Sequence, residues 1–170
     1  MRTSLLLAAL LGATLAATGC SDSDDGVDSP RSDVPAPLAG AWFTGTLSTL
    51  DYYDATTDTW VDRPGEGFFV VIDGDGGYET GAIIDTTAGG CTTRLLGDEV
   101  GTVTVAGDQL TVYRHWVKTR VTSTCGDDGE RTEGEATRQL TWSVDRDGDG
   151  VEWLTLTHAD DATETYHRWE

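Results

Sequence analysis

The sequence predicts an all-β domain, most simply a single antiparallel up-and-down barrel of about eight strands. Thr, Val, Trp and Tyr, which favour a pleated and half-buried surface, are abundant after residue 38. Gly and Asp pairs interrupt the chain roughly every ten residues, as they do between short strands. No stretch after residue 38 has the periodicity of a helix. Barrel closure removes exposed sheet edges, and a two-sheet β-sandwich is the alternative.

The first element is an apolar segment that is too short to span a bilayer comfortably. Arg2 precedes it, and residues 5–17 carry no charge, which is the pattern of a secretory signal. It ends in Ala-Thr-Gly-Cys20, which resembles the lipobox of bacterial lipoproteins. The resemblance implies a signal peptide over residues 1–19 and an acylated Cys20 that anchors the protein in a membrane. The alternative is an ordinary secretory signal with an incidental cysteine.

Residues 20–38 form an acidic and Pro-rich stretch after this signal. Asp is frequent in its first part, and Pro30, Pro35 and Pro37 mark its second part. This composition offers too little apolar surface for a core, so we expect an exposed tether, followed by a barrel domain over residues 39–170. The acidic run after Cys20 resembles the surface-export signals of some bacterial lipoproteins. That resemblance implies a lipid-anchored location in the cell envelope, at the outer membrane or the cell surface.

The charge of the chain limits its partners. The sequence has 11 basic and 30 acidic residues. Removal of residues 1–19 takes away Arg2 and no acid, so 10 basic residues remain against 30 acidic ones, a net charge of −20. A charge of this sign disfavours nucleic acid and anionic ligands. We therefore expect no nucleic-acid partner.

The stretch from Cys91 to Cys125 is predicted to be a long β-hairpin. Two strand-like runs flank residues 107–108, a Gly-Asp pair that suits a tight turn. With a two-residue turn Cys91 faces Thr124, one residue short of Cys125. A single β-bulge, or a slightly longer turn, makes the two cysteines direct partners. We therefore expect a disulfide between them, formed in an oxidising compartment.

The remaining strands follow from alternation and turn signals. In order, strands are predicted over residues 41–53, 67–73, 78–85, 91–105, 109–123, 133–144, 151–158 and 163–169. Residues 68–72 are apolar on both faces, unlike the alternating strands. They form either the most buried strand, covered outside by the excursion over residues 54–65, or a face that binds a partner.

Gly40-Ala41-Trp42 opens the first predicted strand. It resembles the Gly-x-Trp signature of lipocalins and related calycin barrels. The resemblance implies that the Trp42 indole closes one end of the barrel. It also implies that a basic residue near the last strand, here Arg168, stacks across the indole.

Asp145, Asp147 and Asp149 form the main candidate metal site. They stand at alternate positions before a glycine, as at the start of a calcium loop. The acid that closes such a loop is missing, because Leu156 occupies its position. We therefore expect an acidic hairpin turn that binds calcium weakly at most.

No catalytic or cofactor motif is visible, and we expect a protein that is not an enzyme and carries no cofactor. The chain has no Gly-x-Ser-x-Gly elbow, no His-Glu-x-x-His and no phosphate-binding glycine loop. An eight-stranded barrel has room for its own side chains or for one small ligand. Small residues among large ones, at 42–47 and 78–83, leave space if they point inward.

The expected function is therefore to bind or carry a small, partly apolar molecule, uncharged or cationic, at the cell envelope. Arg94, Arg114 and Lys118 are the candidate basic residues at the mouth of the barrel. The alternative is a structural or protein-interaction lipoprotein, with a filled barrel and an envelope protein as its partner.

Overall fold

The computed structural model describes residues 29–46, 53–54, 59–60 and 65–169, and these contain strands and turns but no helix. The strands are β1 (Gly40–Gly45), β2 (Tyr53–Asp54), β3 (Thr59–Trp60), β4 (Gly65–Ile72), β5 (Gly77–Ala88), β6 (Cys91–Ala106), β7 (Gln109–Ser123), β8 (Gly129–Glu133), β9 (Ala136–Arg146), β10 (Glu152–His158) and β11 (Thr163–Arg168). The excursion expected over residues 54–65 lies largely outside the described residues.

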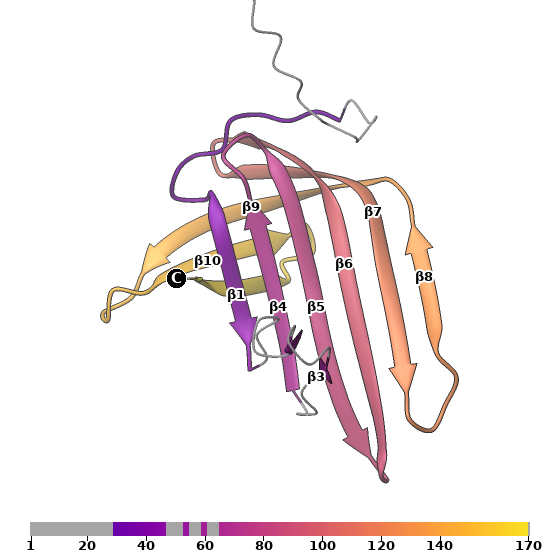
Figure 1. The fold of residues 1–170 in the computed structure, drawn as a ribbon. Coiled ribbons are helices and arrows are strands. Elements are labelled where there is room, and N and C mark those ends of the chain that lie inside the picture. The colour runs from indigo at the N-terminus through magenta and orange to yellow at the C-terminus, as the bar shows by residue number, and fades with distance from the viewer. Residues whose placement is uncertain (1–28, 47–52, 55–58, 61–64, 170) are drawn as a thin grey trace, which may run out of the picture.

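Eight of these strands close into a barrel (Figure 1). Their hydrogen-bonded order is β1-β4-β5-β6-β7-β9-β10-β11, and β11 pairs back with β1. All of these pairs are antiparallel. β8 adds a further strand beside β7, and β2 pairs with β3 in a separate two-stranded sheet. The predicted up-and-down barrel is confirmed, and the sandwich alternative is wrong.

The strands β5 to β8 continue beyond the closed part of the barrel (Figure 1), and we call this part the extension. There β7 pairs with β8 over residues 117–121, whereas nearer its first turn β7 pairs with β9 over residues 109–114. The strand expected over 133–144 corresponds to β9, which begins at Ala136, whereas β8 was not predicted. β8 and β9 are separate strands because β9 pairs with β7 along the barrel wall, whereas β8 pairs with β7 along the extension.

A β-bulge in the β6–β7 hairpin determines how the two cysteines pair. The register shifts between Val100 and Gly101, where His115 is the extra residue on β7. This shift of one residue brings Cys91 opposite Cys125, with 5.5 Å between their Cα atoms and a disulfide between their sulfurs. The predicted hairpin and disulfide are therefore confirmed.

Alternate residues of the strands point into the barrel and form its core. The buried apolar side chains, each at most 5% exposed, are Leu38, Trp42, Val70, Ile72, Tyr78, Val103, Leu110, Val112, Leu140, Leu154, Leu156 and Tyr166. Trp42 and Leu38 fill the end that carries the turns after β4, β6 and β9, which we call the closed end. The open end carries the turns after β5, β7 and β10.

Residues 30–38, which we call the strap, cross the closed end. The Ser32 amide donates a hydrogen bond to the Val103 carbonyl over 3.1 Å. Leu38 is fully buried in the core, and Val34 packs against that core. The sequence placed these residues in the exposed tether, but the contacts of the domain begin by residue 30. The difference arises because two apolar side chains are enough to plug a barrel end, although the composition around them is polar.

Candidate functional site

The closed end contains the stack expected between Trp42 and Arg168. The guanidinium carbon of Arg168 lies 4.1 Å from the ring centroid of Trp42. The indole N–H donates to the Leu38 carbonyl over 2.9 Å. Gly40 has a φ of +133°, and a Cβ at this position would overlap Nη1 of Arg168. The glycine therefore leaves the space that the guanidinium occupies, and the indole offers the face on which it stacks.

Arg168 also joins the closed end to the strap. Its nitrogens donate to the carbonyls of Ala39 over 2.9 Å and Pro37 over 2.7 Å. It forms an ion pair with Glu152, which also accepts a hydrogen bond from Arg146 over 2.6 Å. The hydrogen bond from Arg146, and then that from Arg168, holds the pKa of Glu152 below its usual value. This end of the barrel is therefore closed by a network of ion pairs and hydrogen bonds to the strap.

A pocket of about 220 Å³ lies at the open end. Its lining comprises Phe68, Tyr78, Thr80, Gly81, Ala82, Gly97, Asp98, Glu99, Val117, Arg138, Glu164 and Tyr166. The space exists because Thr80, Ala82 and Gly97 have small side chains or none. Pockets for drug-sized ligands span about 300–1,000 Å³, so this pocket fits a more compact molecule.

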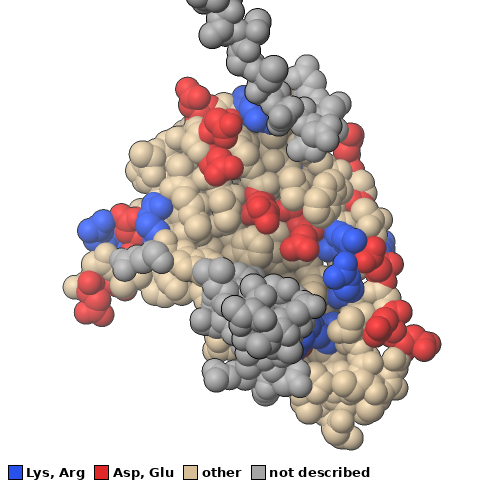
Figure 2. Space-filling model, viewed as in Figure 1, with Lys and Arg blue, Asp and Glu red and all other residues tan. Residues whose placement is uncertain are grey.

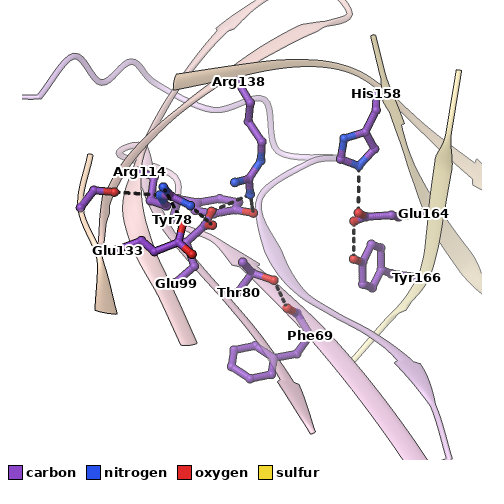
Figure 3. Close-up of polar contacts among 11 residues, drawn as sticks. Phe69, Tyr78, Thr80, Glu99, Arg114, Glu133, Arg138, His158, Glu164 and Tyr166 are labelled. Carbon is purple, nitrogen blue, oxygen red and sulfur yellow. Dashed lines mark hydrogen bonds and ion pairs between the residues drawn. The ribbon is translucent and has the colours of Figure 1, made fainter. Parts of the chain in front are cut away.

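Glu99, Arg138 and Tyr78 form a hydrogen-bonded group in the wall of this pocket (Figure 3). Nη2 of Arg138 lies 2.6 Å from Glu99 Oε1 and 2.7 Å from the Tyr78 hydroxyl. Glu99 is 8% exposed and Tyr78 is 5% exposed. Burial raises the pKa of Tyr78 to about 12, against the opposing effect of Arg138. Burial alone would lower the pKa of Arg138, but its contacts with Glu99 and Tyr78 together outweigh burial and raise that pKa, so the guanidinium stays charged at neutral pH.

A second hydrogen-bonded group, from β10 and β11, faces the first (Figure 3). The Tyr166 hydroxyl donates to Glu164 Oε2 over 2.6 Å, and His158 Nε2 lies 2.8 Å from Glu164 Oε1. Burial, followed by the hydrogen bond to Glu164, raises the pKa of Tyr166. Tyr166 therefore stays a hydrogen-bond donor at neutral pH. The Glu164 side chain is 46% exposed, which leaves its carboxylate accessible to a ligand.

The charges of the pocket lining are unequal. Glu99 and Glu164 are the carboxylates that face the pocket, and Arg138 is its cationic side chain. Asp98 lies directly opposite Lys118, on the other face of the sheet. Since Arg138 is already paired with Glu99, the remaining charge of the lining is negative. Such a lining favours a cation, or an uncharged hydrogen-bond donor, over an anion.

The three basic residues expected at the mouth have different positions. Arg114 lies 4.0 Å from Glu99, at the edge of the first hydrogen-bonded group. Lys118 and Arg94 stand on the opposite face of their strands and pair with acids there: Lys118 with Glu130 and Arg94 with Asp85. Figure 2 shows that basic side chains on the viewed face have acidic neighbours. These two residues therefore do not contribute to the pocket.

Asp147 is engaged by its own turn. Its Oδ1 accepts hydrogen bonds from the amides of Asp149 over 2.9 Å and Val151 over 3.0 Å, and its Oδ2 accepts one from the Trp153 indole over 2.8 Å. The hydrogen bond from Trp153 contributes most to lowering the pKa of Asp147. Among the described residues no three His, Cys, Asp or Glu side chains are grouped to hold a metal ion. Asp145 is therefore not part of such a group either. Weak calcium binding at this turn stays a prediction.

Glu99, Arg138 and Glu164 were not predicted as site residues. The available signal was alternation, because Glu99 shares a strand face with Val103, and Glu164 shares one with Tyr166. A charged residue in a strand is usually assigned to the solvent side, and for this reason Glu99, Arg138 and Glu164 were not recognised as pocket residues. Cys20 lies outside the described residues.

A scan against protein-family models, a search of curated proteins and a search of solved structures each found no match. No helix among the described residues is long and apolar enough to cross a bilayer. Function must therefore be inferred from the two ends of the barrel.

Proposed function

We propose that the protein is an envelope lipoprotein whose lipocalin-like barrel binds a small, partly apolar molecule at its open end. The observation that carries the proposal is the open-end pocket, where aromatic and small side chains meet accessible ionisable groups. Such a combination of apolar walls with a few convergent polar groups is typical of small-molecule sites.

The size of the ligand follows from the filled core. Trp42, Leu110 and Leu154 are fully buried and occupy the barrel beyond the pocket. A long acyl chain has no space to enter there, so the proposed ligand is compact. Its proposed charge is zero or positive, because the surplus of carboxylates in the lining repels an anion.

Calorimetric titration with hexylamine, hexanol and hexanoate tests this proposal, since the three share one apolar tail and differ in charge. We expect the amine to bind most tightly and hexanoate most weakly. Glu164→Gln removes the accessible charge and should weaken amine binding about tenfold, the value of one charge-assisted hydrogen bond, while hexanol binding changes little.

The control variant is Glu130→Gln, which removes an exposed carboxylate on the extension. It should bind all three compounds like the unmodified protein. Saturable binding of none of the three, or tightest binding of hexanoate, would show that the pocket does not have the proposed role.

The anchor is a separate part of the proposal and rests on the lipobox-like sequence before Cys20. Mass spectrometry of the exported protein should show loss of residues 1–19 and a lipid adduct on Cys20. An unmodified N-terminus at another residue contradicts it.

A second candidate function is that of a protein-interaction lipoprotein, which the filled core at the closed end of the barrel favours. This function predicts a stoichiometric envelope partner in cells that express the protein. Cross-linking from Trp116, a large apolar side chain 38% exposed on the extension, should then capture one partner.

A further inference from the structure

A second cavity, of about 580 Å³, lies at the rim of the closed end, between the β9–β10 turn and the end of β11. It shares no lining residue with the open-end pocket. His167 and Trp169 form its aromatic side, and Arg146, Asp149 and Glu152 provide polar groups. Its volume falls within the range of about 300–1,000 Å³ that is usual for ligand sites.

A row of aromatic side chains runs from this cavity across the outer wall of the barrel. Trp153 pairs with His167, His167 with Phe43, and Phe43 with Phe69, on the neighbouring strands β10, β11, β1 and β4. The His167 ring centroid lies 5.6 Å from that of Phe43 and 5.7 Å from that of Trp153. Trp42, next to Phe43 in the chain, points into the core, so the row faces outward. Outward positions of antiparallel barrels usually carry polar residues, which makes this row unusual.

The ends of the row are held in place. The Trp153 indole donates to Asp147 over 2.8 Å, which fixes the ring beside the β9–β10 turn. The Trp169 ring lies 5.5 Å from that of Phe43, and its amide donates to the Ala41 carbonyl over 2.9 Å. Trp169 thus connects the row with the cavity. Aromatic rings fixed before binding lose little conformational entropy when a ligand arrives.

The charges around the cavity cancel. Arg146 and Arg168 face Asp149 and Glu152, two cations against two carboxylates. The cavity therefore has no preference for a charged ligand, but it offers both hydrogen-bond donors and acceptors. A sugar ring is uncharged, has an apolar face of C–H groups that can lie on an aromatic ring, and has an edge of hydroxyls that both donate and accept.

We propose that this cavity and the aromatic row bind a neutral oligosaccharide. One terminal unit of the oligosaccharide occupies the cavity beside Trp169, and its hydroxyls form hydrogen bonds with Arg146 and Asp149. Adjacent strands are ~4.8 Å apart, so a sugar chain laid along the row passes over one ring on each strand. The ring planes of Phe43 and His167 are 87° apart, so in this pair one ring offers its face to the sugar and the other offers its edge. The site therefore favours a chain of several units over a monosaccharide. This inference is independent of the open-end pocket, with which it shares no residue.

Calorimetric titration of the full-length protein with cellohexaose, chitohexaose and mannohexaose tests the inference. At least one hexasaccharide should bind saturably, and the matching disaccharide should bind at least tenfold more weakly. Trp169→Ala and Arg146→Gln should each weaken hexasaccharide binding by tenfold or more. Neither residue belongs to the buried core, so circular dichroism should show an intact fold for both variants.

Trp116→Ala is the matched control, because it removes another accessible tryptophan, on the extension and far along the chain from this site. It should bind the hexasaccharide like the unmodified protein. The inference is overturned if none of the three hexasaccharides binds, or if folded Trp169→Ala and Arg146→Gln both bind as tightly as the unmodified chain.

Discussion

Arg168 is the side chain that connects most parts of the closed end. It stacks on Trp42, donates to the strap and pairs with Glu152. Trp42 and Pro37 lie near the start of the domain and Glu152 lies on β10, so Arg168, on the last strand, links the first strand, the strap and β10. A planar guanidinium suits this role because it stacks and donates in several directions at once.

Gly40 and Arg168 should be energetically coupled. Gly40→Ala places a Cβ where Nη1 of Arg168 lies, at a φ that non-glycine residues rarely adopt. We expect it to lower the free energy of unfolding by about 2 kcal/mol or more. In an Arg168→Ala background the overlap is gone, so the same change should cost about 1 kcal/mol less. Urea denaturation of the four proteins of this cycle measures the coupling, and additive effects would contradict it.

Tyr78 makes stability sensitive to alkaline pH. Its pKa is about 12 in the folded protein and 10.0 ordinarily, so below pH 10 both states keep the proton. Above pH 10 the unfolded state loses its proton while the folded state retains it. Stability should therefore fall as pH rises from 10 to 12, by on the order of 2–3 kcal/mol. Urea midpoints at several pH values should show this decrease, and Tyr78→Phe should make it smaller.

At the scale of elements, the β6–β7 hairpin was predictable almost in full. Alternation and the Gly-Asp turn set its register, and the positions of Cys91 and Cys125 required one extra residue. The location of the bulge at His115 was not predictable, because it depends on how β7 bends between β9 and β8. β8 was not predicted as a separate strand, although Gly134 stands between it and β9.

The disulfide should stabilise the extension in particular. The two cysteines are 34 residues apart, and in the chain-entropy model a loop of this size contributes roughly 3–4 kcal/mol. Replacing both cysteines by Ser should lower the free energy of unfolding by up to about that amount. Loss of the disulfide should increase the hydrogen-exchange rates of the extension amides more than those of the amides at the closed end of the barrel. Reduced unmodified protein is the control and should match the Ser variant.

At the scale of the whole molecule, the sequence predicted the fold class but not the extent of the domain. Eight strand signals and close turns were enough for a barrel. The strap was assigned to the tether because its composition is polar, whereas Leu38 alone adds a fully buried side chain to the core. The open-end site was missed for a related reason: its charged residues face inward only because neighbouring strands pair them with one another.

The strap should be part of the cooperative unit. Leu38→Ala removes a fully buried side chain from the closed end and should cost about 3 kcal/mol, as large-to-small core changes usually do. Asp33→Ala, at an exposed strap position, should change stability by less than about 0.5 kcal/mol. Thermal unfolding of both variants checks this. Equal stability of Leu38→Ala and the unmodified protein would mean that the strap is not needed for the fold.

The strap also decides which end of the barrel lies nearer the proposed anchor at Cys20. The chain enters the domain at the closed end, so in the proposed anchored protein the closed end is the one joined to the tether. The open-end pocket then points outward, and the extension projects from the same end (Figure 1). A ligand can therefore diffuse into the pocket without passing through the narrow gap between the protein and the surface that carries it. The extension is then the part of the molecule that a ligand approaching from solution contacts first.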